Sequence, residues 1–316
     1  MKILANDGIA QKGVEALEKS GFEVITTKVA QEQLIDYINE NDIIGILVRS
    51  ATQIRKNIID GCPGLKLIGR GGVGMDNIDV AYAKEKGLHV INTPAASSES
   101  VAELVFAHLF GGVRFLYDAN RQMPLEGDAK FKQLKKSYGG GTELRGKTLG
   151  VIGFGRIGRA TAKIALGVGM KVVYYDPFLE NVELTVSFFD GRSLDFKLIT
   201  SSKDEVLETS DFITLHVPAQ KEYVIGKREL EIMKDGVGIV NAARGGVLDE
   251  VALVAALEKG KVSFAGLDVF ESEPNPEIKI LMHPRISLTP HIGAATGEAQ
   301  DRIGTELAAQ IIKLLK

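Results

Sequence analysis

Short apolar runs rich in β-branched residues recur through the first hundred residues, and longer stretches with helical periodicity separate them. They predict strands at Lys2–Asn6, Phe22–Thr26, Ile43–Val48, Leu65–Ile68 and Val90–Asn92. Such alternation is typical of βαβ units, whose strands run parallel. Almost every residue of the run from Ile43 to Val48 is apolar, which indicates a strand covered on both faces. We therefore expect an α/β domain here.

A second series of the same kind follows a long helical segment. It predicts strands at Thr148–Ile152, Lys171–Tyr175, Phe212–His216, Gly238–Asn241, Phe264–Asp268 and Ile286–Thr289. The length of 316 residues also exceeds the usual size of one hydrophobic core. The fold class expected is therefore α/β, with two doubly wound parallel-sheet domains of the Rossmann or flavodoxin type and a cleft between them.

The segment that separates the two series predicts a helix opening at Ser100, with Ser100 and Glu103 in the spacing of a capping box. Its apolar residues cover almost the whole circumference and are Val101, Leu104, Val105, Phe106, Leu109, Phe110, Val113 and Phe115. One face would be enough for packing inside one core. Either a partner subunit covers the remainder, or the helix is central and buried within one subunit. The first interpretation predicts a homodimer.

The last predicted helix, from about Glu298 to Leu315, has an amphipathic stripe with a spacing of four residues. The stripe consists of Ala299, Ile303, Leu307, Ile311 and Leu315. Such a stripe must pack on an existing core, and we expect it to return to the first domain. The substrate domain would then be discontinuous, formed by residues 1–97 and 291–316, with the nucleotide-binding domain at 98–290. His291 would lie at the crossing between them.

One segment departs from the alternation of strands and helices. Residues 182–190 and 194–200 each alternate apolar and polar positions around an Asp190–Gly191 turn. A period of two on both sides of such a turn predicts an inserted β-hairpin.

Composition and charge narrow the classes of function. With 45% hydrophobic and 25% charged residues, the chain is ordinary for a globular protein. Lys and Arg total 38 against 41 Asp and Glu, so no basic field attracts nucleic acid or an anionic membrane. The single Cys62 excludes an internal disulfide, and neither a secretion signal nor a membrane span is visible. We expect a cytoplasmic protein with a small-molecule substrate.

The sequence GFGRIG at 153–158 follows a predicted strand and opens a predicted helix. There Gly153 permits a tight turn, Gly155 lets the backbone approach a pyrophosphate, and Gly158 allows close contact between helix and strand. Asp176 ends the next strand about 20 residues on, where its carboxylate can accept hydrogen bonds from the adenosine ribose. This predicts dinucleotide binding, with NAD favoured over NADP because the carboxylate would repel a 2′-phosphate.

A second glycine cluster, Arg70–Gly74, also follows a strand but lacks the third glycine of that motif. Its amides could hold a carboxylate in a backbone nest, or the cluster could simply be a tight turn. No group of His, Cys and carboxylate residues has the spacing of metal ligands, so we expect catalysis without a metal.

Three candidate catalytic residues follow late strands, at the edge where an open α/β sheet binds its ligand. They are Arg244, Glu273 and His291. Oxidation of a 2-hydroxy acid needs a cation for the carboxylate, a base for the hydroxyl proton and a group that orients the base. Taken singly, the three also fit an ion-pair partner, a solvated acid and a hydrogen-bonded structural histidine.

In their order along the chain, the motifs resemble those of the D-isomer-specific 2-hydroxyacid dehydrogenases, most closely the short-type D-3-phosphoglycerate dehydrogenases. The resemblance covers essentially the whole chain. It rests on VRSAT from Val48, GRGGVGMDNID, NTP, SVAEL, GKTLGVIGFGRIGR, DFITLHVP, NAARGGVLDE, GLDVFESEP and TPHIGAAT.

The resemblance implies that His291 is the acid/base, that Glu273 pairs with its ring, and that Arg244 binds the carboxylate and carbonyl side of the substrate. The substrate pair it implies is 3-phosphoglycerate and 3-phosphohydroxypyruvate, in serine biosynthesis. The expected substrate contacts include the backbone amides of Val73 and Gly74. Arg49 and Arg70 follow strands of the first domain and could bind the phosphate together with Ser50, or the two arginines could instead make structural ion pairs. The expected NAD contacts are Gly153, Gly155, Arg156, Ile157, Gly158, Asp176, His216, Val217, Pro218, Ala242, Ala243, Arg244, Asp268, His291, Gly293 and Ala294.

The chain departs from the pattern of this family in three places. The hairpin after Asp176 is unusual, the segment Lys130–Lys136 lacks a Trp-containing pattern found in many relatives, and the end at Lys316 leaves no room for a small-ligand regulatory domain. A glyoxylate or hydroxypyruvate reductase is therefore the alternative within the family. An NAD-sensing, corepressor-like binding protein is the alternative from another class.

Overall fold

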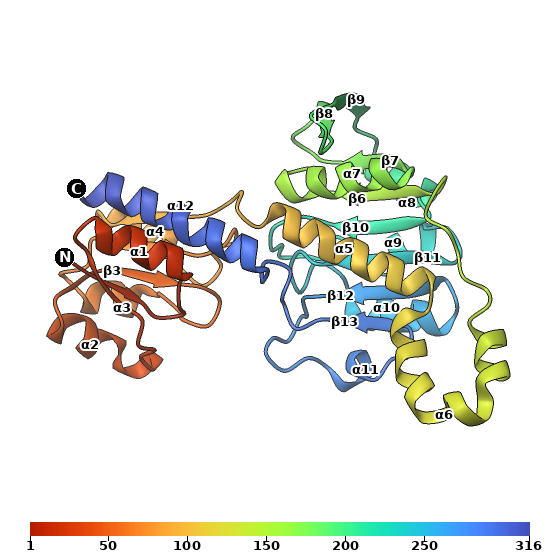
Figure 1. Ribbon diagram of the computed structural model, residues 1–316, viewed down its shortest axis with the longest axis horizontal. Helices are drawn as coiled ribbons and strands as arrows, with labels where there is room; N and C mark the ends of the chain where they lie inside the picture. The colour runs from red at the N-terminus through yellow and green to blue at the C-terminus, as the bar shows by residue number, and fades with distance from the viewer. The chain divides into compact units, whose positions relative to one another are not determined.

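The computed structural model describes residues 1–316 and divides the chain into two compact units (Figure 1). Unit 1 comprises Met1–Ser100 and Ala294–Lys316, and unit 2 comprises Val101–Gly293. Each unit contains a parallel sheet between helices, so the expected α/β fold class with two parallel-sheet domains is confirmed.

Unit 1 has a five-stranded sheet in the order β2-β1-β3-β4-β5, and all neighbouring strands are parallel. The strands are β1 (Lys2–Ala5), β2 (Glu23–Ile25), β3 (Ile43–Val48), β4 (Leu67–Arg70) and β5 (His89–Asn92). The helices are α1 (Gln11–Lys19), α2 (Leu34–Glu40), α3 (Lys56–Gly61), α4 (Val80–Glu85) and α12 (Gly297–Leu315), with a 3-10 turn at Gln31–Gln33. This strand order is that of flavodoxin-like folds.

The closing helix α12 completes the core of unit 1. Thr296 caps it by accepting a hydrogen bond from the N–H of Ala299. The buried stripe of α12 packs with α1 on one face of the sheet and includes Ala299, Ile303, Leu307 and Ile311. Gly13 and Gly304 let the two helices approach closely, since a Cβ on Gly13 would lie 2.7 Å from the carbonyl oxygen of Gly304. The predicted return of the last helix to the first core is confirmed.

Unit 2 has a six-stranded parallel sheet in the order β13-β12-β11-β10-β6-β7. The strands are β6 (Thr148–Ile152), β7 (Lys171–Tyr175), β10 (Phe212–Leu215), β11 (Val237–Asn241), β12 (Val262–Leu267) and β13 (Ile286–Leu288). The helices are α5 (Ser98–Val113), α6 (Leu116–Ser137), α7 (Arg156–Val168), α8 (Lys203–Thr209), α9 (Lys227–Ile232), α10 (Glu250–Glu258) and α11 (Ile278–Leu281). Residues of α5 and α7 pack on one face of the sheet, and residues of α8, α9 and α10 on the other.

Helix α5 begins two residues earlier than expected. Ser100 therefore lies inside the helix, so the capping box predicted for Ser100 and Glu103 is wrong. The hydroxyl of Ser100 instead pairs with that of Thr296 at 2.8 Å, a partner that lies far along the sequence. Most apolar residues of α5 are buried, but Phe110 remains 46% exposed.

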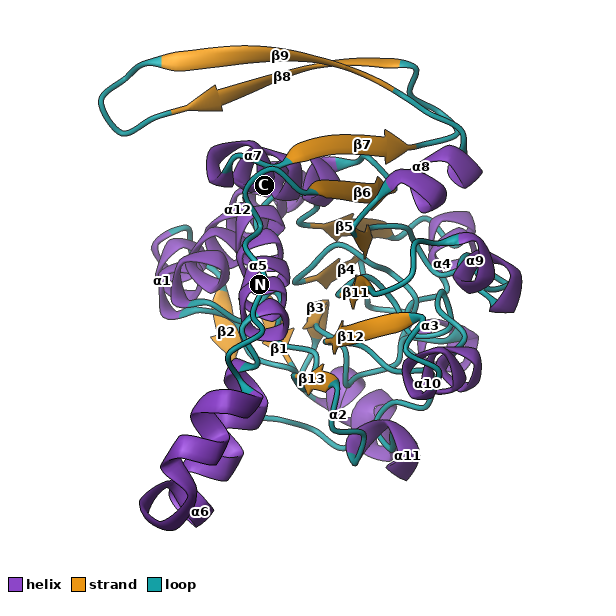
Figure 2. Cartoon of the chain, turned by 90° about the vertical axis from the view of Figure 1, so that its right-hand side faces the viewer, coloured by secondary structure: helices purple, strands orange, loops and turns teal.

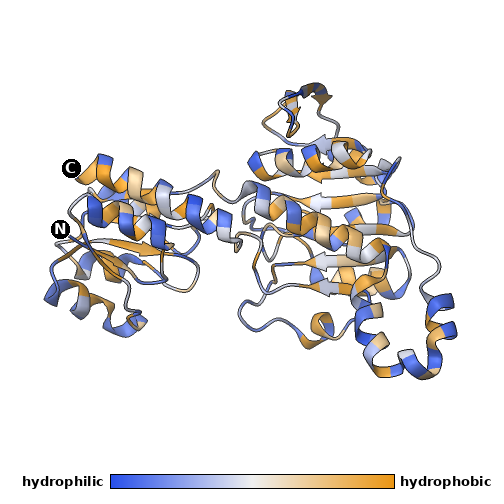
Figure 3. Cartoon of the chain, viewed as in Figure 1, coloured by the Kyte–Doolittle hydropathy of each residue, from blue (hydrophilic) through white to orange (hydrophobic).

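Helix α6 forms a bent arm (Figure 1). Pro124 lies inside it, and Lys130 has non-helical backbone angles that interrupt it. Hydrophilic and hydrophobic residues both occur along the arm (Figure 3). No single helix of the chain is long and apolar enough to cross a membrane; α5 and α6, bent by 56° at their junction, meet that criterion only as a pair.

The inserted hairpin is present as predicted. Strands β8 (Asn181–Ser187) and β9 (Ser193–Ile199) pair antiparallel, and Gly191 in the connecting loop has a φ of 82°. The hairpin lies over α7 and the edge strand β7 (Figure 2).

Candidate active site

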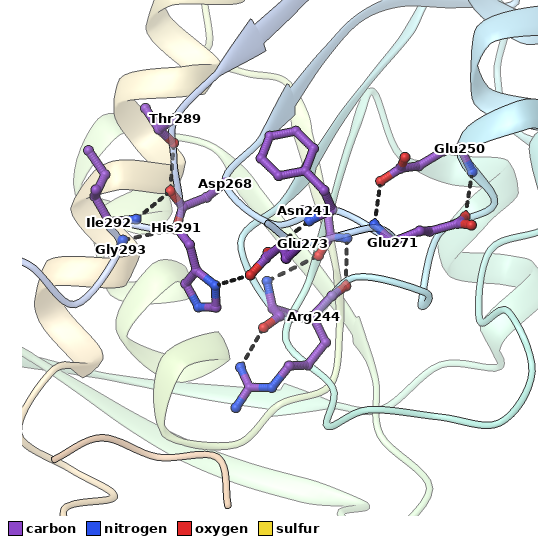
Figure 4. Close-up of polar contacts among 12 residues, drawn as sticks. Asn241, Arg244, Glu250, Asp268, Glu271, Glu273, Thr289, His291, Ile292 and Gly293 are labelled. Atoms are coloured by element: carbon purple, nitrogen blue, oxygen red, sulfur yellow. Dashed lines mark hydrogen bonds and ion pairs between the residues drawn. The ribbon is translucent and has the colours of Figure 1, made fainter. Parts of the chain in front are cut away.

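Three adjacent strands of unit 2 place the candidate catalytic residues. In the sheet, β11, β12 and β13 are neighbours and run parallel, so their carboxyl ends share one edge. Arg244 follows β11, Glu273 follows β12 and His291 follows β13. Parallel order thus gathers residues that are separated by up to 47 positions in sequence, and Figure 4 shows the three side chains grouped at these strand ends.

His291 and Glu273 form a hydrogen-bonded pair. The imidazole Nδ1 lies 2.8 Å from Oε2 of Glu273, while Oε1 of Glu273 accepts a hydrogen bond from the N–H of Phe270 at 3.0 Å. An ionised carboxylate can only accept, so Nδ1 carries the hydrogen in the neutral ring and Nε2 keeps a lone pair. His291 is 41% exposed. Its ring is therefore oriented by the carboxylate and still accessible to a ligand.

Arg244 is held by the turn that follows β11. Asn241 donates from its side-chain amide to the carbonyl of Arg244 at 2.9 Å and accepts from the N–H of Ala243 at 3.0 Å. The guanidinium donates to the carbonyl of Ala243 at 2.6 Å. The next residue, Gly245, passes so close to Phe270 that a Cβ there would collide with the Phe270 carbonyl. This close passage brings the Arg244 turn against the loop that leads to Glu273.

Asp268 fixes the turn that carries His291. Its Oδ1 accepts from the hydroxyl of Thr289 at 2.7 Å and the N–H of Ile292 at 2.8 Å, and Oδ2 accepts from the N–H of Gly293 at 2.8 Å. The carboxylate is almost fully buried. His291 itself has a φ of 55°, an unusual conformation for a residue with a side chain. Charge-assisted hydrogen bonds donated to the Asp268 carboxylate hold this backbone in place.

His108 extends the same network from α5. Its ring nitrogens lie 2.9 Å from the hydroxyl of Ser287 and 3.1 Å from that of Thr289. Burial lowers the pKa of His108, which favours the neutral ring, and the two contacts link α5 to β13 and the turn after it. The sequence gave no signal for these partners, because they are close only in the folded sheet.

The glycine loop at 153–158 has the geometry of a pyrophosphate site. Gly153 has a φ of 91°, and a Cβ there would lie 2.6 Å from the carbonyl oxygen of His216. A Cβ on Gly158 would collide with the carbonyl of Gly153, whereas the space around Gly155 is open. Gly155 also precedes the 13-residue helix α7, whose N-terminal N–H groups attract anions. The loop therefore fits a dinucleotide.

Asp176 follows β7 and supports this loop. Its Oδ2 accepts from the N–H of Phe154 at 2.8 Å, and its Oδ1 accepts from the N–H of Phe178 at 2.9 Å. Each carboxylate oxygen has two lone pairs, so both can accept a further hydrogen bond from a ribose hydroxyl. The half-buried carboxylate is open enough for this.

The other residues expected to contact NAD lie along the carboxyl edge of the same sheet. Ala242 and Ala243 follow β11, and Gly293 follows the His291 turn. Arg156 and Ile157 open α7, and His216, Val217 and Pro218 follow β10. Ala294 is separate from these, because it opens the second segment of unit 1.

Unit 1 holds the remaining predicted substrate residues at the carboxyl ends of two paired strands. Arg49 and Ser50 follow β3, Arg70 ends β4, and Val48 is the register partner of Arg70. The guanidinium of Arg70 donates to Asn77 at 3.2 Å, whereas that of Arg49 makes no hydrogen bond or ion pair. Val73 and Gly74 continue the loop after β4, where the Asn92 amide donates to the carbonyl of Val73 at 2.8 Å.

A pair of glutamates next to the site was not anticipated from the sequence. The backbone N–H of Glu250 donates to the side-chain carboxylate of Glu271 at 3.0 Å, and the backbone N–H of Glu271 donates to the carboxylate of Glu250 at 2.9 Å (Figure 4). Burial raises the pKa of Glu250. The reciprocal bonds tie the loop before Glu273 to the start of α10. A cavity of about 410 Å³ adjoins His291 and Glu273 and is otherwise lined by Phe270, Pro274, Pro276, Leu281, Leu288, Thr289 and Pro290.

The fold and this site together define a nucleotide-dependent dehydrogenase, and comparisons with known proteins make the class specific. The D-isomer specific 2-hydroxyacid dehydrogenase family, NAD binding domain, matches residues 106–293. The chain is 43% identical over 320 residues to a hydroxypyruvate reductase of Thermotoga maritima, covering 99% of this chain and 98% of that protein.

Two further likenesses agree with this match. The chain is 40% identical over 318 residues to a D-3-phosphoglycerate dehydrogenase of Methanocaldococcus jannaschii, covering 100% of this chain and 58% of that protein. It thus spans little more than half the length of that relative. A crystal structure of D-lactate dehydrogenase from Aquifex aeolicus, complexed with NAD and lactic acid, superposes with a TM-score of 0.76 at 32% identity over 100% of this chain and 95% of that one.

The chain belongs to the D-isomer specific 2-hydroxyacid dehydrogenases. It is an NAD-dependent enzyme of that family, as the resemblance of its motifs implied.

Proposed function

We propose that the enzyme interconverts 3-phosphoglycerate and 3-phosphohydroxypyruvate with NAD. The observation that carries this choice is the pair Arg49 and Arg70 at the ends of adjacent strands, with the Arg49 guanidinium unpaired. A phosphate carries nearly two negative charges at neutral pH, so its site needs cations beyond the one that binds the carboxylate. Arg49, Ser50 and Arg70 are proposed to bind it.

His291 is the proposed acid/base. In the oxidative direction its Nε2 takes the proton of the substrate hydroxyl while Nδ1–H remains bonded to Glu273. The imidazolium that forms then lies 2.8 Å from a carboxylate, which stabilises its charge. In the reductive direction the same nitrogen returns the proton to the carbonyl oxygen. NAD, when bound, supplies the hydride acceptor.

Arg244 is the proposed cation for the substrate carboxylate. A planar guanidinium can bind a carboxylate with two parallel hydrogen bonds, which also fixes the orientation of the 2-carbon. The amides of Val73 and Gly74 are proposed to add donors to the same carboxylate. Asp176 is proposed to bind the adenosine ribose of NAD.

A hydroxypyruvate or glyoxylate reductase is the second candidate. The relative from Thermotoga maritima favours it, because this chain is 43% identical to that hydroxypyruvate reductase over 99% of its residues. The two candidates differ in whether a phosphate improves the substrate.

The test is the ratio of kcat/KM for phosphohydroxypyruvate to that for hydroxypyruvate, with glyoxylate and pyruvate measured alongside. We expect the phosphorylated substrate to be preferred, and Arg49→Gln to reduce the preference by at least about tenfold, the loss expected for one charge-assisted contact. Arg55→Gln is the matched control, since Arg55 already pairs with Asp79 on the surface of unit 1. A wild-type enzyme that gains nothing from the phosphate is instead a general 2-keto acid reductase.

We also propose that the enzyme is a homodimer, formed through α5 and α6. Phe110 is 46% exposed, and the arm exposes Leu116 at 63%, Leu125 at 75% and Phe131 at 56%. Large apolar side chains concentrated on one helical segment mark an interaction surface.

A further inference from the structure

The inserted hairpin carries an interaction surface that the dehydrogenase reaction does not use. We propose that β9 pairs antiparallel with β9 of a second copy of this chain, about a twofold axis at Phe196. Three features of the hairpin support this pairing: the polarity of its two faces, the unpaired backbone edge of β9, and the charges on its outer face.

The two faces of the hairpin differ in polarity. Opposing residues share a face, and the inner face carries the apolar pairs Val182–Leu198, Leu184–Phe196 and Val186–Leu194. The three β8 members are buried beneath the hairpin, where β8 contacts α7. Their β9 partners are less covered, and Leu194 is 56% exposed. The apolar row of β9 is therefore only partly covered by unit 2.

The outer edge of β9 has unpaired backbone groups. Across the hairpin, the backbone N–H of Phe188 donates to the backbone carbonyl of Arg192, and the backbone N–H of Thr200 donates to the backbone carbonyl of Glu180. Hydrogen-bonded and non-hydrogen-bonded pairs alternate in an antiparallel ladder, so the even-numbered residues of β9 bond to β8. The odd-numbered residues of β9 therefore direct their N–H and C=O groups away from β8.

Only the end of β9 is tied to the main sheet. The N–H of Ser201 donates to the carbonyl of Tyr174, and Thr200 bridges the same residue. β9 contacts β7 at this end, whereas the preceding residues of β9 have no hydrogen-bond partner on this side. An open strand edge of this kind is a template for pairing with another strand.

Charges on the outer face select one register. Pairing through this edge places odd-numbered residues opposite odd-numbered residues. A twofold axis at Phe196 sets Asp195 opposite Lys197 of the second copy, and symmetry repeats the pair. The neighbouring registers set Asp195 opposite Asp195 or Lys197 opposite Lys197, and like charges directly opposite destabilise a sheet.

The same register joins the apolar rows. Phe196 meets Phe196, and Leu194 meets Leu198 of the second copy, at the pairs where side chains approach most closely. Association thus removes from water the side chains that unit 2 leaves partly exposed. A second copy matches both the charges and the apolar row because it carries the same strand, which is the reason we assign it as the occupant.

The test uses two charge-reversal variants of β9. Each variant should pair poorly with a second copy of itself, whereas the two variants should pair with one another. Asp195→Lys leaves lysine at both position 195 and position 197. Lys197→Asp leaves aspartate at both, and it is made together with Glu183→Lys because Glu183 faces Lys197 across the hairpin. Each variant alone should weaken self-association by about tenfold or more, measured by sedimentation equilibrium. An equimolar mixture should regain it, because every lysine then faces an aspartate.

Controls separate this contact from folding and from net charge. Asn181→Lys adds a positive charge to β8 away from the open edge and should leave the mass unchanged. NADH-dependent turnover and the rate of proteolysis at Phe188 and Phe189 report whether the hairpin variants are folded. The proposal is overturned if wild type and Asp195→Lys have the same mass throughout the concentration range, or if folded variants fail to associate when mixed.

Discussion

At the scale of single residues, the proposed chemistry depends on one hydrogen bond between His291 and Glu273. The bond fixes the ring, and the surrounding backbone is held by Asp268 and by the N–H of Phe270. Each side chain is an ordinary polar residue on its own. Their combined effect comes from hydrogen bonds that leave only Nε2 of His291 to exchange a proton.

Replacing His291 with Ala should lower kcat by roughly 100- to 10,000-fold, the range typical of general acid/base groups. Tight binding of NADH should remain, because the glycine loop and Asp176 are untouched, and fluorescence titration with NADH would measure it. Glu273→Gln is the companion variant. It keeps a hydrogen-bond partner for the ring but removes the charge, so we expect a smaller loss of kcat. Near-normal turnover in His291→Ala would refute the assignment.

His216 gives a second residue-scale prediction, on acid stability. Burial lowers the pKa of its ring to about 3; Nδ1 is shielded without a partner, while Nε2 lies 3.0 Å from the Thr214 hydroxyl. The unfolded chain has the ordinary pKa near about 6.5. Because the folded pKa is the lower one, the stability contribution is complete above pH 6.5 and is lost as the pH falls toward the folded pKa.

Urea unfolding between pH 7 and pH 4 would measure this effect in the protein without added NAD. His216 should contribute a slope of up to about 1.4 kcal/mol per pH unit, and His216→Gln should show a correspondingly flatter dependence. Equal slopes for wild type and variant would mean that the ring is protonated in the folded state.

At the scale of elements, we propose that the junction of β6, the glycine loop and α7 determines cofactor choice. The loop begins where the strand order of the sheet reverses, between β6 and β10, and such a crevice is the usual ligand site of an open α/β sheet. Asp176 accepts a hydrogen bond from the N–H of Phe154 at this junction, and we propose that its charge also faces the ribose of NAD.

Two substitutions at Asp176 separate those effects. Asp176→Asn keeps an oxygen for the Phe154 N–H but removes the charge, so NADP should be used better while NAD binding weakens little. Asp176→Ala loses both, so it should relax the discrimination and also raise the KM for NAD. The measurement is kcat/KM with each cofactor. A wild-type enzyme that already prefers NADPH would contradict the role of the carboxylate.

At the scale of the whole molecule, the proposed homodimer rests on apolar surface that unit 2 does not bury. Light scattering at micromolar concentration should give at least the mass of a dimer. Leu125→Glu combined with Phe131→Glu should reduce that mass, because both side chains are exposed on α6. Lys132→Glu, an exposed polar position of the same arm, is the control and should leave the mass unchanged. A monomeric wild type would return α5 to the interpretation of an internal core helix.

The sequence by itself determined the class of fold and the chemistry available. Apolar runs such as Ile43–Val48, the alternation around Asp190–Gly191 and the last helix were readable because their burial follows from local periodicity. The order of motifs also identified the residue types of a 2-hydroxyacid dehydrogenase. These features depend on side chains that lie close together in the chain.

Only the tertiary structure decided how the distant groups of the site are held together. Strand order brings Arg244, Glu273 and His291 to one edge of the sheet. The hydrogen bonds by which Asp268 holds the His291 turn have no signal in the local sequence. The same is true of the reciprocal hydrogen bonds between Glu250 and Glu271. The start of α5 was misplaced for the same reason, since Ser100 bonds to Thr296 instead of capping its own helix. Local propensities are weak compared with long-range hydrogen bonds and burial, so such details become fixed only when the sheet has formed.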